Sequence, residues 1–358
     1  MSTVLLVLEV PSKAAFQDPA GLRPEWSTTI QDAVRKVRQD DSSNPETPSR
    51  IAIFFVLLPS QISSSGAPAF SFEQLEKFLQ WVYAQAWSVA VERDQLLLDV
   101  DVLLVHQRHL LTTIQGQLQR SKGHDVQTLC DAKLVQTLPS EFSSLLENAT
   151  PISFQHDSER SSASETTSSA ALPQHPVVAL GGTFDHLHPG HKILLSCAAA
   201  LATRKLIIGI TTDEMLAKKA EAHLLEDLET RKERVRDFVD RFWNGLHPDP
   251  HQSDASEGEG QRLEIDAVTL KDVAGPAGTE EDLQALVLTD ETISGGEFID
   301  KVRAEKGLGA LEHFVIGVLG AKGETDLGGK GTDAKTLAAA KVGSTAIRKW
   351  LAAKQGSS

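Results

Sequence analysis

The chain has 358 residues, a formal net charge of −14 and a hydrophobic fraction of 41%. This length suits two domains of ordinary size, and the composition is that of a globular protein. The acidic excess argues against nucleic-acid partners, whose phosphates it would repel. No apolar run reaches the roughly 18 residues needed to span a bilayer, so no membrane partner is expected.

The chain has only two cysteines, Cys130 and Cys197, and no CxxC pair. A disulfide framework and a thiolate zinc site are therefore not expected. The apolar N-terminus lacks a basic region and a small-residue cleavage site, which indicates a strand and not a signal peptide. With no targeting signal recognised, the cytoplasm is the default expectation.

The first part of the chain predicts a small α/β domain over residues 1–145. Apolar runs at 4–10, 51–58 and 97–105 are typical of buried strands, whereas 26–37 and 72–91 have helical spacing. This alternation favours a layered α/β structure. We find no catalytic motif here, so its role is left open.

A change of composition predicts a flexible linker over residues 146–175. Its centre, 158–170, is rich in Ser, Thr and Glu and has almost no large apolar side chains. Such a segment cannot bury enough surface to offset the entropy lost on ordering.

The last part, residues 176–355, predicts a doubly wound parallel sheet. Strands are expected at 177–180, 205–210, 263–269, 285–288 and 313–319. Helices are expected at 191–202 and 230–243, and a further one after an N-cap at Thr212 or Asp213. Alternating strands and helices favour a parallel sheet, which binds ligands beyond the carboxyl ends of its strands.

The run Gly-Gly-Thr-Phe-Asp-His-Leu-His-Pro-Gly-His at residues 181–191 follows a predicted strand and opens a predicted helix. Its glycines let the backbone approach a phosphate, and the helix aims free N–H groups at the same place. His188 and His191 flank Pro-Gly, so both rings can face that pocket. Displacement at a nucleotide α-phosphorus needs pre-placed donors of this kind and no covalent nucleophile.

Two other interpretations of this run stay open. His186, His188 and His191 could ligate a metal, although their spacing is not the i, i+4 of a helical zinc pair and no carboxylate or cysteine beside them completes a set. Alternatively, the glycines are ordinary turn residues and the histidines are incidental.

These residues resemble the signature of the HxGH nucleotidyltransferase superfamily. A second element of that superfamily, ISSTxIR, resembles Val-Gly-Ser-Thr-Ala-Ile-Arg at 342–348, with Gly343 in place of one serine. We expect Ser344 to N-cap the helix that follows, which leaves donors for the β- and γ-phosphates. Alone, this segment would be only a capped helix.

Between the two elements, residues 275–308 resemble the eukaryotic and archaeal type of phosphopantetheine adenylyltransferase, also found as one half of bifunctional CoA synthases. The resemblance covers residues 176–353. It implies a Rossmann-like fold, with ATP and 4′-phosphopantetheine as substrates and dephospho-CoA and pyrophosphate as products. It also implies Mg²⁺ bound through ATP, with no metal ligand among the protein side chains.

The resemblance also implies roles for individual residues. Catalysis would involve Thr183, His188, His191 and Lys219. ATP would be bound by Gly181, Gly182, Thr183, Phe184, His191, Gly295, Gly296, Arg303, Ser344, Thr345 and Arg348. The acceptor would be bound by Thr183 and by Lys218 or Lys219. Lys219 could instead lie on a solvated helix face, and Arg348 could be an ordinary surface arginine.

The chain departs from the family pattern in two places. Ser294 stands where related sequences carry an arginine, so another donor would have to replace it. Residues 320–341 form a long Gly/Lys-rich segment, for which we predict a mobile loop. Gly-Gly-Lys-Gly-Thr at 328–332 lacks P-loop spacing. We therefore expect no dephospho-CoA kinase half, and a reaction that stops at dephospho-CoA.

Two other functions are compatible with the sequence. The first is another HxGH transferase, of the nicotinamide mononucleotide or cytidylyl type, although Lys-Val-Gly-Ser-Thr at 341–345 is not the RTxGIS-like second motif of cytidylyltransferases. The second is a non-catalytic scaffold, in which residues 1–145 recruit other coenzyme A enzymes. Even if the chain is catalytic, this segment could dock such partners.

Overall fold

The computed structural model describes residues 2–10, 12–22, 24–38, 48–63, 68–138, 142, 148–154, 171–247, 262–317 and 343–356. The centre of the predicted linker and the predicted mobile loop lie outside these ranges. The chain divides into two compact units, one formed by Met1–Leu172 with Asn244–Pro248 and the other by Pro173–Trp243 with Asp249–Ser358. None of the helices in the described ranges combines the length and apolar character that crossing a membrane requires.

The first unit contains a five-stranded parallel sheet in the order β3-β2-β1-β4-β5. Its strands are β1 (Ser2–Glu9), β2 (Arg50–Leu57), β3 (Asp99–His106), β4 (Asp125–Asp131) and β5 (Thr150–Ile152). Its helices are α1 (Pro19–Leu22), α2 (Pro24–Lys36), α3 (Phe72–Glu92), α4 (Leu110–Arg120) and α5 (Ala132–Thr137). All residues of β1 are buried, as expected for a parallel strand covered on both faces.

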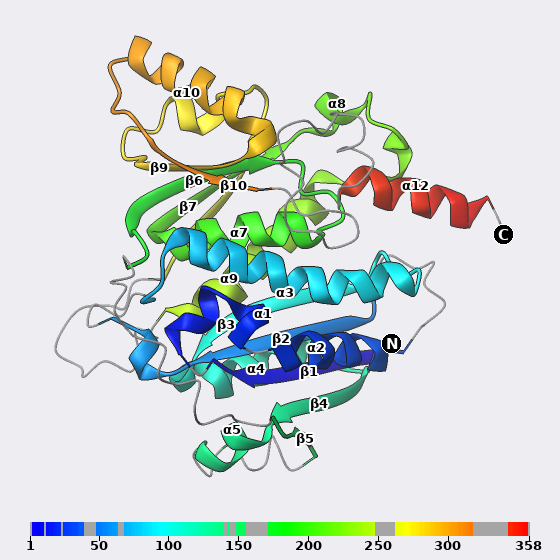
Figure 1. The fold of residues 1–358 in the computed structure, drawn as a ribbon. Helices are drawn as coiled ribbons and strands as arrows, with labels where there is room; N and C mark the ends of the chain where they lie inside the picture. The colour runs from blue at the N-terminus through cyan, green and yellow to red at the C-terminus, as the bar shows by residue number, and fades with distance from the viewer. Residues whose placement is uncertain are drawn as a thin grey trace. The chain divides into compact units, whose positions relative to one another are not determined.

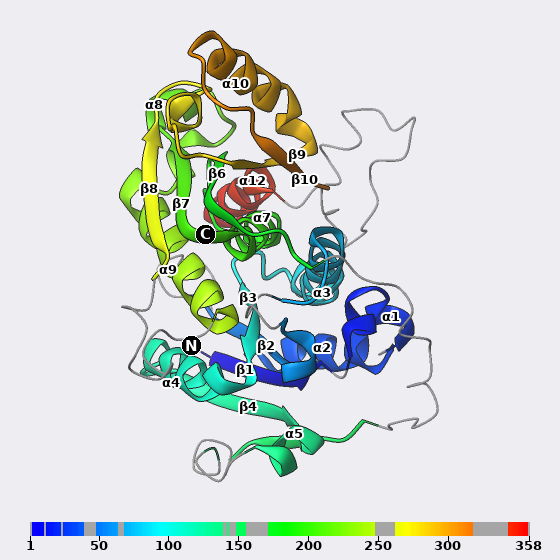
Figure 2. The same cartoon turned by 90° about the vertical axis from the view of Figure 1, so that its left-hand side faces the viewer.

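The second unit contains another five-stranded parallel sheet, in the order β10-β9-β6-β7-β8 (Figures 1 and 2). Its strands are β6 (His175–Gly182), β7 (Ala202–Thr211), β8 (Glu264–Leu270), β9 (Ala285–Thr289) and β10 (Glu312–Ile316). Its helices are α7 (Pro189–Leu201), α8 (Asp213–Leu216), α9 (Leu228–Leu246), α10 (Ile293–Glu305) and α12 (Ser344–Gln355). The predicted class, an α/β chain whose C-terminal part forms a doubly wound parallel sheet, is confirmed. The preceding α/β unit was predicted to be smaller, but it also holds a five-stranded parallel sheet.

Strand β6 lies at the centre of this second sheet and sets the position of the site. The chain leaves β6 through α7 towards β7 and β8, and later returns to the other side of β6 to form β9 and β10. Figure 1 shows α7 and α10 on opposite sides of the sheet. The winding therefore reverses between β6 and β9, which is where open α/β sheets form a ligand crevice.

The core beneath α10 consists of apolar side chains from the sheet and its neighbouring segments: Val177, Ala179, Ile207, Ala277, Leu283, Leu286, Leu288 and Ile299. On the opposite face, α7 is buried along almost its whole length. Two packed faces hold the sheet rigidly, so the ends of β6 and β9 are fixed relative to each other.

Candidate active site

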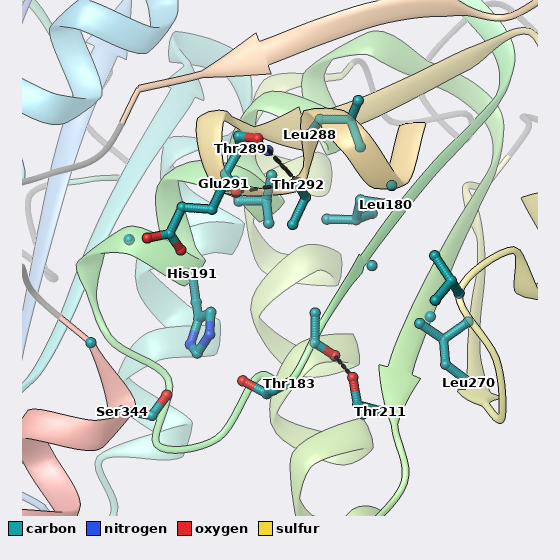
Figure 3. A pocket seen from close by; sticks show the side chains of 18 of the residues that line it. Leu180, Thr183, His191, Thr211, Leu270, Leu288, Thr289, Glu291, Thr292 and Ser344 are labelled. Carbon is teal, nitrogen blue, oxygen red and sulfur yellow. Dashed lines mark hydrogen bonds between the residues drawn. The ribbon is translucent and has the colours of Figure 1, made fainter. Parts of the chain in front are cut away.

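A pocket of about 1040 Å³ lies at the carboxyl ends of the central strands of the second unit (Figure 3). It is lined by the end of β6 and the start of α7 on one side, and by β9 and the start of α10 on another. Around the beginning of α12, the lining also includes Gly343, Ser344, Thr345, Ala346, Arg348 and Lys349. This pocket therefore lies where the sequence predicted a ligand site, beyond the carboxyl ends of the strands.

Two histidines stand at the entrance to α7 and line this pocket. His188 is the N-cap residue, and Pro189 fixes the backbone at the first helical position. The rings of His188 and His191 stack, with centroids 3.8 Å apart and planes inclined by 24°. Neither Nδ1 atom has a hydrogen-bond partner among the described residues. Both imidazoles therefore retain hydrogen-bonding capacity for a ligand.

Burial keeps both imidazoles neutral at physiological pH. Removal from water lowers the pKa of His191 to about 3, and the nearby His186 contributes to the decrease. Burial also lowers the pKa of His188 well below its ordinary value, with smaller contributions from neighbouring histidines and Lys192. A neutral ring carries one N–H, so each histidine can donate to a phosphate oxygen without bringing a charge of its own.

The loop between β6 and α7 is strained at two places. Phe184 and His186 have positive φ values of 49° and 44°, which side-chain-bearing residues rarely adopt. The Phe184 ring is fully buried, and a Cβ added to Gly182 would lie 3.0 Å from its Cζ atom. A side chain at 182 would therefore crowd the Phe184 ring, so packing favours glycine there. Phe184 itself is fully buried and does not line the pocket, so the structure does not support its predicted contact with ATP.

Asp185 connects this loop to α12 through a buried ion pair. Its Oδ2 accepts a hydrogen bond from Nη1 of Arg348, and both side chains are almost completely excluded from solvent. The Oγ hydroxyl of Ser344 donates to the Asp185 carbonyl at 2.8 Å. The expectation that Ser344 N-caps the helix is therefore wrong: Gly343 is the N-cap residue, and the serine hydroxyl fastens α12 to the loop.

Arg348 lines the pocket, but its guanidinium is already engaged by protein groups. Besides Asp185, it donates to the Ala220 carbonyl at 2.9 Å and to the Thr345 hydroxyl at 3.3 Å. The alternative of an ordinary surface arginine is excluded because only 2% of the residue is exposed. These contacts indicate that Arg348 orients α12 and contributes positive potential to the pocket.

A cluster of possible metal ligands lies beside the loop and consists of Asp185, His186 and Glu226. Both carboxylates already face cations, Arg348 for Asp185 and Arg234 for Glu226. A divalent ion would have to compete with these arginines for the same oxygens. The carboxylates of the cluster are therefore already neutralised by ion pairs with arginines. His188 and His191 do not belong to the cluster.

Several other predicted residues line the pocket, whereas four, Phe184 among them, do not. Those that do, in addition to His188, His191 and Arg348, are Gly181, Gly182, Thr183, Lys219, Gly295, Ser344 and Thr345. Figure 3 shows the side chains of Thr183, His191 and Ser344 pointing into the same space. Lys218, Gly296 and Arg303 are absent from the lining.

Arg303 and Gly296 take part in the packing of α10. Arg303 is 1% exposed and donates to the carbonyls of Gly309, Ala277 and Glu280 at 2.8–2.9 Å. A Cβ on Gly296 would meet the Leu288 side chain at 2.5 Å, so glycine lets α10 approach β9. The predicted ATP contacts of these two residues are not supported.

Three charged residues that line the pocket were not predicted as site residues from the sequence: Asp272, Glu291 and Lys349. Lys349 is exposed and lies one helical turn after Thr345, which belongs to the Ser-Thr element (residues 342–348). Its i, i+4 spacing from Thr345 could have predicted that it lies on the same face of the helix. Asp272 and Glu291 carry no comparable local signal. The Asp272 carboxylate accepts a hydrogen bond from the backbone of Gly275 at 2.7 Å.

A parallel sheet, a glycine-rich loop after its central strand and two neutral histidines at the next helix define a nucleotide-binding α/β unit of the HxGH type. The cytidylyltransferase-like family model matches residues 179–305. A phosphopantetheine adenylyltransferase of Methanosarcina acetivorans is 33% identical over 168 residues, which cover 43% of this chain and 95% of that relative. The chain belongs to the phosphopantetheine adenylyltransferase family.

Two further proteins are similar to a part of this chain. The phosphopantetheine adenylyltransferase of Saccharomyces cerevisiae is 41% identical over 148 residues, which cover 41% of this chain and 43% of that protein. The chain thus matches less than half the length of this yeast relative. A crystal structure of an Archaeoglobus fulgidus protein with unknown function is 26% identical, with a TM-score of 0.31, and covers 39% of this chain and 97% of its own.

Proposed function

We propose that the second unit transfers the adenylyl group of ATP to 4′-phosphopantetheine, which gives dephospho-CoA and pyrophosphate. The pair of stacked, neutral histidines in the pocket at the end of β6 carries this proposal. The pocket alone is compatible with several phosphate-bearing acceptors. The choice of 4′-phosphopantetheine is supported by the relatives that are named phosphopantetheine adenylyltransferase.

In the proposed reaction, a phosphate oxygen of the acceptor attacks the α-phosphorus of ATP. A new P–O bond forms as the bond from the α-phosphorus to the bridging oxygen breaks, and pyrophosphate leaves with the electron pair. Thr183, His188 and His191 surround the space into which the α-phosphate would fit and donate hydrogen bonds to its oxygens. Such donors lower the barrier because negative charge grows there in the transition state.

The two substrates would occupy different sides of the pocket. The first turn of α12, with Ser344 and Thr345, offers free N–H groups and the positive end of the helix dipole to the triphosphate. Lys219, exposed at the rim after α8, is placed to receive the acceptor phosphate, whereas Lys218 lies outside the lining. Gly295, at the start of α10, leaves room for the adenosine.

Magnesium would enter with the nucleotide. The carboxylates of Asp185 and Glu226 form ion pairs with arginines, and the Asp272 carboxylate accepts a hydrogen bond from the Gly275 amide. These carboxylates are therefore poor candidates for ligands of a permanently bound ion. Bound to the phosphates, Mg²⁺ would neutralise part of the charge on the leaving group. That the reaction stops at dephospho-CoA, and that the first unit binds other coenzyme A enzymes, stay predictions.

The substrate assignment is tested by measuring pyrophosphate release from the purified full chain with ATP and Mg²⁺. The acceptors are 4′-phosphopantetheine, nicotinamide mononucleotide and phosphocholine, and CTP replaces ATP in a parallel series. Release with ATP and 4′-phosphopantetheine only is the expected result. Release with another pair would preserve the roles in the pocket but reject the acceptor. Folded protein that binds ATP and releases nothing would favour the scaffold hypothesis.

A further inference from the structure

Arg231, near the beginning of α9, was not singled out in the sequence and is fully buried. Its guanidinium is shared among four acceptors from separate parts of the chain. Nη1 donates to the carbonyls of Thr183 at 2.7 Å and Thr211 at 2.9 Å. Nε donates to the Glu226 carbonyl at 3.0 Å, and Nη2 forms an ion pair with Asp213.

These acceptors lie at the base of the pocket. Thr183 directly follows β6 and Thr211 ends β7, so one side chain joins the carboxyl ends of two adjacent strands. The Thr211 hydroxyl adds a second link between them, because it donates to the Gly182 carbonyl at 3.2 Å (Figure 3). The hydrogen bonds of Arg231 therefore fix the backbone turn at Thr183 relative to the end of β7.

The ion pair with Asp213 extends this connection to the rim of the pocket. Asp213 is the first residue of α8, which leads directly to Lys219, and the Lys219 amide donates to the Leu216 carbonyl at 2.8 Å. A buried guanidinium thus connects the turn that carries Thr183 with the segment that carries Lys219. A planar fork with several donors can fix such a relationship, which a single point charge cannot do.

We infer that Arg231 is a positioning residue that sets the distance between the phosphate-binding turn at Thr183 and the Lys219 segment. This inference rests on the proposed function for the assignment of that segment to the acceptor. In a displacement reaction, a misplacement of about 1 Å can cost two orders of magnitude in rate, so the link matters for orientation as well as for folding.

The exposed end of the link gives the cleanest test. Asp213→Asn removes the charge of a side chain that is 55% exposed, so it should leave the fold intact. We expect the KM for 4′-phosphopantetheine to rise about five- to twenty-fold, with the Kd for ATP within two-fold of that of the unaltered chain. Glu214→Gln removes the adjacent exposed carboxylate, which is not among the hydrogen-bond or ion-pair partners of Arg231 in the described structure, and should change neither constant. Equal effects of the two substitutions, or none from Asp213→Asn, would overturn the inference.

Arg231→Lys tests the fork itself, because it retains the positive charge but cannot reach all four acceptors. We expect a ten- to hundred-fold lower kcat in protein that still unfolds cooperatively. A variant with the same kcat and the same KM for the acceptor would contradict the positioning role.

Hydrogen exchange separates this inference from the proposed function. If the unaltered chain releases no pyrophosphate with any acceptor, the function fails. The inference still predicts faster amide exchange over residues 213–219 and 183–187 in Asp213→Asn than in Glu214→Gln. Unchanged exchange in both segments would reject the positioning role, whatever the activity.

Discussion

Arg348 of α12 and Asp185 of the loop after β6 form a buried ion pair although 163 residues separate them in the chain. The pair fastens the Ser-Thr element of α12 to the turn that carries Thr183. Its members belong to the two sequence elements from which we predicted the site, so the ion pair explains how these elements come to face one pocket.

Breaking this pair should cost more stability than removing it as a whole. Arg348→Gln leaves the Asp185 carboxylate buried without its cation, and we expect a loss of about 3–5 kcal/mol in the free energy of unfolding. The double substitution with Asp185→Asn should recover part of that loss. Urea unfolding of the four proteins measures the coupling. A loss below about 1 kcal/mol for Arg348→Gln would show that the pair is not structurally important.

His191→Ala should lower kcat by about 10²–10³-fold, because it removes a pre-placed donor from the pocket. The Kd for ATP should change far less if the hydrogen bond strengthens in the transition state. His223→Ala, at an exposed position outside the lining, is the matched control. Steady-state kinetics and calorimetric ATP binding give the two quantities. Equal loss of kcat in both variants would remove the assigned role.

The lowered histidine pKa values predict a specific dependence of stability on pH. Each group binds its proton more weakly in the folded chain than in the unfolded chain, so acid favours unfolding. For His191, stability should fall as the pH drops below about 6.5, by up to about 1.4 kcal/mol per pH unit, until the pH reaches about 3. His188 should act in the same direction. Urea unfolding at several pH values should give a shallower slope for His191→Asn. An unchanged slope would mean that His191 protonates normally in the fold.

Lys349 should contribute to binding of the triphosphate. It lines the pocket on the same face of α12 as Thr345. We expect Lys349→Glu to raise the KM for ATP at least several-fold, and the effect should shrink as salt is added, because an exposed charge is screened. Lys354→Glu alters the same helix at a residue packed over the Trp350 ring and outside the lining, and should have a smaller effect. Similar changes in both variants would indicate only the net charge of the helix.

A side chain at Gly209 should force Leu270 to move, since a Cβ there would lie 2.6 Å from Cγ of Leu270. We expect Gly209→Ala to destabilise the chain by about 1–3 kcal/mol, as overpacking generally does. Gly116→Ala, in α4 with no atom within 4 Å of the added carbon, should instead stabilise it by about 0.5–1 kcal/mol. Thermal unfolding of both variants checks the two signs, and destabilisation by Gly116→Ala would contradict the expectation for an open helical site.

The sequence predicted the strand, turn and helix from 177 to 202 because local signals coincide there: an apolar run, two glycines and Pro189 at the helix start. Strand β4 escaped prediction because its residues, Asp-Val-Gln-Thr-Leu-Cys-Asp, form no apolar run. Helix α10 escaped because it contains Gly295 and Gly296 and has no clear apolar stripe.

The roles of the buried arginines were harder to predict. Arg303 and Arg231 donate to carbonyl groups that lie between 5 and 48 residues away, and no local pattern identifies such acceptors. Family resemblance suggested a ligand for Arg303, whereas the fold gives it backbone partners. Ser344 was misassigned for a similar reason, since its partner, the Asp185 carbonyl, is brought near by the tertiary fold alone.

We propose that the pocket at His188 and His191 joins an adenylyl group to 4′-phosphopantetheine. The most direct measurement is mass spectrometry of the products formed by the full chain from ATP, Mg²⁺ and 4′-phosphopantetheine, beside the folded His188→Ala, His191→Ala double variant. We predict dephospho-CoA and pyrophosphate in equal amounts, with formation reduced by at least two orders of magnitude in the double variant. Undiminished dephospho-CoA from that variant, or pyrophosphate without dephospho-CoA from the unaltered chain, would contradict the account.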